Sequence, residues 1–141
     1  MIRRLVPALA LVALFTLSAC DSGGPAPIGV TGTWEGVVFD PNIEGAPRYP
    51  ITVRMNDNGI EVSGQGTVRD IPEGDLAFFI DRGSSFVEGR LTLALRFDRP
   101  PFIGSLAGVL VNEDPGRIEG TLQGSGSARG DVRIEITSRR S

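Results

Sequence analysis

The chain has 141 residues with 14 basic and 17 acidic side chains, a formal net charge of −3, no histidine and a single cysteine. All of its basic residues are arginines. The absence of histidine and lysine excludes Ser-His-Asp, Cys-His and Schiff-base arrangements, and the acidic balance argues against nucleic-acid binding.

Residues 1–19 have the layout of a secretory signal peptide. Two arginines precede a mostly apolar run over 5–17, which is shorter than the roughly 20 residues that a membrane-spanning helix needs. The sequence LSAC then follows at 17–20. This stretch resembles the lipobox of bacterial lipoproteins. The resemblance implies cleavage before Cys20, a diacylglycerol on its thiol and a further acyl chain on its amine. The alternative is an ordinary secretory signal with a chance cysteine, or a thiol buried in a core.

The lipobox resemblance also implies a location. Two or three acyl chains hold a protein firmly on a membrane, so we expect a bacterial cell-envelope protein that is lipid-anchored and faces the periplasm. The choice between inner and outer membrane stays open. Residues 20–30 have the Gly-, Ser- and Pro-rich composition of a linker. Residues 31–141 are long enough for one folded domain.

The mature chain shows repeated period-two alternation and no sustained helical period. In the stretch VEGRLTLALRF at 87–97, the apolar residues Val87, Leu91, Leu93, Leu95 and Phe97 fall on one face. Turn residues separate the alternating stretches. A tight turn is expected at Asn56–Gly59, and Asp114–Gly116 fits a type II turn. These signals predict eight strands at 32–39, 49–56, 59–69, 75–80, 85–97, 104–111, 117–123 and 131–137.

Five glycines stand in similar settings, each two residues after an apolar residue. We expect them on the inward face at mid-strand, where they suit a strongly coiled sheet; they are Gly36, Gly64, Gly89, Gly108 and Gly120. Eight short strands paired in sequence order predict an all-β domain, an eight-stranded antiparallel up-and-down barrel. A β-sandwich is the alternative.

The first strand opens with Gly32-Thr33-Trp34. This triplet is similar to the start of lipocalin-like (calycin) barrels. The resemblance implies that Trp34 closes the barrel base under an arginine near the last strand. By parity Arg133 faces outward, and Arg140 lies one residue from the end. Alternatively, Trp34 is an ordinary core aromatic.

The remaining motifs carry little chemistry. Glu88, Glu119 and Glu135 alternate outward as solvated strand residues, and RMNDNGI at 54–60 lacks the first carboxylate of a calcium loop. GSGSARG at 124–130 precedes a strand and not the helix of a phosphate loop. We therefore expect no enzyme, cofactor or metal.

Two functions are consistent with these features. In the first, the anchored barrel binds a small apolar ligand or a lipid in its interior. In the second, it is a structural or protein-docking envelope lipoprotein without a ligand cavity. In a meander the longer loops gather at the end opposite the linker, and binding is expected at that end.

Overall fold

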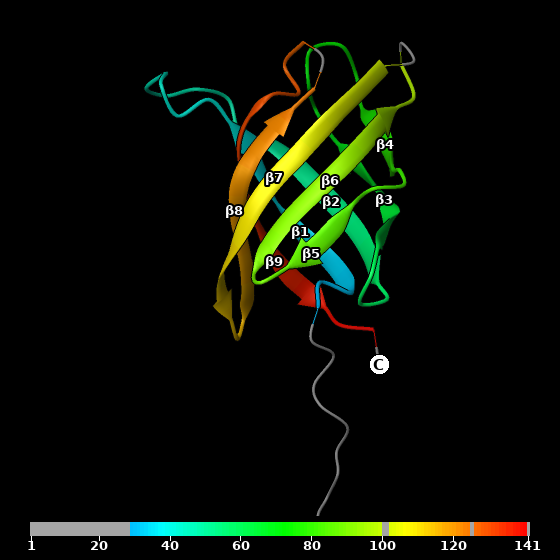
Figure 1. Ribbon diagram of the computed structural model, residues 1–141. Coiled ribbons are helices and arrows are strands. Elements are labelled where there is room, and N and C mark those ends of the chain that lie inside the picture. The colour runs from blue at the N-terminus through cyan, green and yellow to red at the C-terminus, as the bar shows by residue number, and fades with distance from the viewer. Residues whose placement is uncertain (1–28, 100–101, 125, 141) are drawn as a thin grey trace, which may run out of the picture.

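The computed structural model describes residues 29–99, 102–124 and 126–140 (Figure 1). These residues form nine β-segments and no helix. The segments are β1 (Gly32–Phe39), β2 (Tyr49–Asp57), β3 (Val62–Val68), β4 (Leu76–Ile80), β5 (Ser85–Val87), β6 (Arg90–Phe97), β7 (Phe102–Glu113), β8 (Gly116–Gln123) and β9 (Gly130–Ser138).

All pairings are antiparallel, and most of them join strands that are consecutive in the chain. The sheet order is β4-β3-β2-β1-β9-β8-β7-β6-β5, and a further pairing of β4 with β6 closes it on itself. Nine segments make eight barrel strands because β4 and β5 follow one another along β6. Ile80 pairs with Leu95, and Ser85 pairs with Thr92. The predicted eight-stranded up-and-down barrel is therefore confirmed, and the alternative sandwich is not formed.

The predicted single strand at 85–97 is wrong. Its first part, β5, continues the direction of β4, and the chain reverses at Glu88 and Gly89, whose φ angles are 51° and 77°. Two residues with positive φ form the tight turn that suits the twist of a hairpin. Val87 consequently lies on the surface, with 60% exposure, and does not face inward with Leu91.

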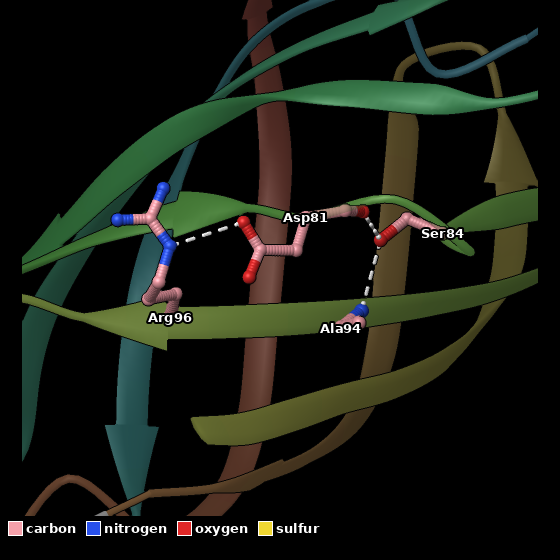
Figure 2. Close-up of polar contacts among 4 residues, drawn as sticks. All are labelled: Asp81, Ser84, Ala94 and Arg96. Atoms are coloured by element: carbon pink, nitrogen blue, oxygen red, sulfur yellow. Dashed lines mark hydrogen bonds and ion pairs between the residues drawn. The ribbon is translucent and has the colours of Figure 1, made fainter. Parts of the chain in front are cut away.

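Residues 81–84, expected to be a hairpin turn, instead interrupt one barrel strand (Figure 2). The Asp81 backbone N–H donates to the Ala94 carbonyl at 2.8 Å. The Ser84 hydroxyl accepts a hydrogen bond from the Ala94 N–H at 2.9 Å and donates to the Asp81 carbonyl at 2.8 Å. A side-chain hydroxyl thus takes the place of a backbone partner where the ladder is broken.

The β2–β3 hairpin lies close to its predicted turn, but its loop is 58–61 and not 56–59, because Asn56 and Asp57 still pair with Ser63 and Val62. At 58–61 the Asn58 side-chain oxygen accepts hydrogen bonds from the Ile60 and Glu61 N–H groups, so β3 begins at Val62 and not at Gly59. The β7–β8 turn lies at Asp114–Pro115 as expected, but this peptide bond is cis. Since Glu113 pairs with Gly116, Pro115 is the third residue of the turn and not the second, so the turn is not type II.

The core fills the inside of the barrel. Inward residues alternate along every long strand, and those of β6, Leu91, Leu93, Leu95 and Phe97, are at most 1% exposed. Phe78 of β4 packs edge-to-face against Phe97 with ring centroids 5.8 Å apart. A barrel of eight strands has an interior that side chains can fill or that can hold one small ligand.

The two ends of the barrel differ. The connections after β1, β3, β6 and β8 gather at one end (Figure 1). Residues 29–31 and 139–140 lie at the other end, which we call the terminus end, together with the turns after β2, β5 and β7. A tether that enters at residue 29 is therefore attached to the terminus end.

Candidate functional site

The expected lipidation residue Cys20 lies outside the described residues, as do the expected signal peptide and most of the expected linker. The first described residues are fastened to the barrel. Val30 is fully buried, and its backbone N–H donates to the Asp57 carboxylate at 3.3 Å. Thr31 and Asp57 exchange two hydrogen bonds, at 2.8 and 3.2 Å. Val30 and Thr31 are thus fixed to Asp57 at the end of β2, at the terminus end.

Trp34 lies at the terminus end of the core and is 1% exposed. Its indole N–H donates to the Val30 carbonyl at 2.8 Å, which satisfies the one polar atom of a buried ring. A Cβ on Gly116 of β8 would lie 2.9 Å from the ring, so Trp34 packs directly over Gly116. No local sequence pattern indicates this contact, because the two residues come together only when β1 pairs with β9 and β9 with β8.

The stacking arginine of lipocalin-like barrels has no counterpart on Trp34 among the described residues. The two cation–π contacts found there join Arg48 to Phe39 and Arg96 to Phe79, with 4.5 and 5.1 Å between guanidinium and ring centroid. Arg133 lies on the outer wall, as its parity predicts, and pairs with Glu119 at 3.1 Å. The barrel is thus compatible with a lipocalin-like architecture but lacks that pairing.

Four of the five singled-out glycines share the inward parity of buried neighbours. At Gly36, Gly64 and Gly120 a Cβ would run into the backbone of the adjacent strand. Gly64 also has a φ of 142°, which favours glycine. At Gly108 a Cβ would lie 2.8 Å from the Cγ2 of Ile118. The space that these glycines leave is therefore occupied by neighbouring strands and side chains.

Gly89 does not belong to this set. It lies in the β5–β6 turn with a φ of 77°, and a Cβ there would meet nothing within 4 Å. Its setting in the sequence matched the others because Val87 and Leu91 flank it with strand-like spacing. Two further glycines, Gly66 and Gly104, also face inward. They lie against the rings of Phe78 and Phe97 respectively.

Two hollows lie outside the packed interior of the described barrel. The larger, about 440 Å³, is at the terminus end, between the last residues of the chain and the ends of β1, β2 and β3. We call it the arginine groove. Its lining residues are Gly32, Thr33, Arg54, Met55, Asn56, Gly64, Ser138, Arg139 and Arg140. The sequence expectation placed binding at the opposite end, where the long loops are.

The second hollow, about 270 Å³, lies beside the first on the outer wall. Arg54 lines both, and the second continues over Gln65 and Thr67 toward the partly exposed ring of Phe79. The sequence alone does not indicate that these side chains lie together. The outward parity of Arg54 was readable on β2, but the position of the C-terminal residues beside it depends on barrel closure.

The described residues hold no group of three or more His, Cys, Asp or Glu side chains that could bind a metal ion. In the same part of the chain, no helix has the length and apolar character needed to cross a membrane. The one buried polar side chain there, Ser84, is occupied by its two backbone hydrogen bonds.

Comparison with protein-family models, with curated proteins and with solved structures found no match to this chain in any of the three. The class that the fold defines is an antiparallel up-and-down β-barrel with a filled interior.

Proposed function

We propose that this protein is a non-enzymatic, lipid-anchored β-barrel of the bacterial cell envelope that acts through its outer surface. The anchor is Cys20, on the strength of the LSAC stretch and the apolar run before it. The barrel is held at the membrane by its terminus end, and it needs no cofactor or metal. Of the two functions expected from the sequence, this is the one without an interior ligand.

The observation that carries the proposal is the filled interior. Inward glycines are the feature that would open a cavity, yet Gly108 faces the Ile118 side chain and Gly36 faces backbone of β9. The large inward side chains around them, among them Leu93, Leu106 and Ile134, are fully buried. Protein interiors are normally packed to this density. The two hollows described above lie on the outside, where a partner or a membrane component would meet them.

Native mass spectrometry of the purified full chain tests the proposal. We expect the mass of the protein with its covalent acyl chains and no molecule bound inside the barrel. The alternative function, binding of a small apolar ligand or lipid inside the barrel, predicts a further non-covalent mass. That extra mass should disappear in the variant Gly108→Leu and persist in Ala107→Leu, which changes the exposed face of the same strand. Such a result would contradict our proposal.

A further inference from the structure

The arginine groove is lined without a single acidic residue, although acids outnumber bases in the chain. Three of its nine lining residues are arginines, and three more, Thr33, Asn56 and Ser138, carry polar side chains able to donate hydrogen bonds. A hollow of this composition is selective by charge. It favours an anion with several oxygen acceptors over a cation or an apolar molecule.

The arginines of the groove are largely free to bind. The structure records no ion pair or side-chain hydrogen bond for Arg54 or Arg140 within the described part of the chain, and both are exposed. Arg139 donates one hydrogen bond, from Nη2 to the Glu113 carbonyl at 2.9 Å, which fixes its position beside the β7–β8 turn. By contrast, Arg133 and Arg96 on the outer wall pair with Glu119 and Asp81.

The arginine side chains and the position of the groove indicate which kind of anion it would bind. A planar guanidinium group can form bidentate hydrogen bonds with two oxygens of a phosphate, whereas an ammonium group cannot. The groove lies at the terminus end, where residues 29–31 connect the barrel to its linker. If the chain is anchored at Cys20, the groove faces the headgroup layer.

We propose that the arginine groove binds a phosphate group, supplied by a phospholipid headgroup of the membrane that holds the anchor or by a soluble phosphate ester. Only the headgroup source rests on the proposed function. The two arginines without partners, Arg54 and Arg140, supply the principal contacts, and Arg139 borders the site. With a headgroup bound, the barrel would stand with its terminus end against the bilayer and its long-loop end outward.

Two measurements on the full chain test this proposal. The first is calorimetric titration with sn-glycerol 3-phosphate in an uncharged detergent. The second is energy transfer from Trp34, the only tryptophan, to a dansyl-labelled lipid in phosphatidylcholine vesicles with or without phosphatidylglycerol. Trp34 is the third residue of β1, which begins at the terminus end, so transfer reports how closely this end approaches the bilayer. The variant is Arg54→Gln with Arg140→Gln. The control, Arg69→Gln with Arg82→Gln, removes the same charge from exposed arginines outside the groove.

We expect saturable glycerol phosphate binding that is at least about tenfold weaker in the groove variant and unchanged in the control. Transfer that rises with phosphatidylglycerol, in the wild type and the control but not in the groove variant, assigns the phosphate to the headgroup. Binding of glycerol phosphate without such a rise assigns it to a soluble ester. Neither effect in the wild type, or the same effects in the groove variant, would overturn the proposal. The calorimetric titration does not depend on whether Cys20 is acylated, so a failure of the groove is distinguishable from a failure of the anchor.

Discussion

The hydroxyl of Ser84 accepts a hydrogen bond from the backbone N–H of Ala94 at 2.9 Å, and so joins β6 to a barrel strand that has no regular partner at that point (Figure 2). The same hydroxyl donates to the Asp81 carbonyl, and the Ser84 carbonyl accepts from the Val62 N–H of β3 at 3.0 Å. One buried serine therefore connects three neighbouring strands at the seam where the barrel closes.

Replacement of Ser84 by alanine should destabilise the barrel by about 1–3 kcal/mol, because it removes two part-buried hydrogen bonds, each of which contributes about 0.5–1.5 kcal/mol. The urea midpoint of the full chain, followed by circular dichroism, measures this change. Ser85→Ala is the matched control, since no hydrogen bond is recorded for that neighbouring side chain and it is only half-buried. Equal midpoints for the two variants would show that the seam does not depend on the Ser84 hydroxyl.

Trp34→Phe should loosen the terminus end of the barrel. The variant removes the hydrogen bond from the indole to the Val30 carbonyl and part of the ring that packs on Gly116. We expect a loss of about 1–3 kcal/mol for the buried carbonyl left unpaired, again read from the urea midpoint. Phe79→Leu, an aromatic change at a 43% exposed position on the outer wall, should cost less. A stability loss confined to Phe79→Leu would contradict this account.

The alternation of apolar and polar residues is enough to predict the barrel. In a closed barrel every long strand has one face in the core and one face toward solvent, so every long strand shows the same alternation. It failed at 81–97. There Asp-Arg-Gly-Ser has the composition of a hairpin turn but lies within one strand, while the true turn at Glu88 and Gly89 is hidden in continuous alternation. Residues 81–84 interrupt a strand and do not form a hairpin because Ser84 bonds to the Ala94 N–H. That bond requires β6 to lie next to Ser84, which no local pattern indicates.

The arginine groove shows a second limit. Period two places Arg54 on the outer face of β2, but nothing local to Arg54 says that Arg140 will lie beside it. The groove forms because β1 pairs with both β2 and β9, so that Arg54 and Ser138 lie on either side of Thr33. A site that forms where the first and last strands pair can be recognised only when the structure of the closed barrel is known.

Cys20→Ser should release the protein from the membrane fraction of cells that produce it. The reason is the LSAC stretch, whose thiol is the attachment point that the lipobox resemblance implies. Membrane and soluble fractions are compared by immunoblotting, and mass spectrometry of the N-terminal peptide of the wild type should show acyl chains on Cys20. Equal partition of both proteins with the membrane, or an unmodified Cys20 peptide, would remove the anchor from the proposed function.

Gly108→Leu should destabilise the barrel, because the new side chain enters space that Ile118 already occupies. A Cβ alone would lie 2.8 Å from Ile118 Cγ2 and 3.1 Å from the Glu119 carbonyl oxygen, and overpacking of a dense core costs roughly 1–3 kcal/mol. Ala107→Leu makes a similar change one residue away on the exposed face, where substitutions usually stay within about 0.5 kcal/mol. Urea midpoints of both variants give the difference. Uptake of an apolar fluorescent dye by the wild type provides a second measurement, and we expect none. An unchanged midpoint for Gly108→Leu, combined with dye uptake that this variant reduces, would mean that the interior is open. Function would then lie inside the barrel and not on its surface.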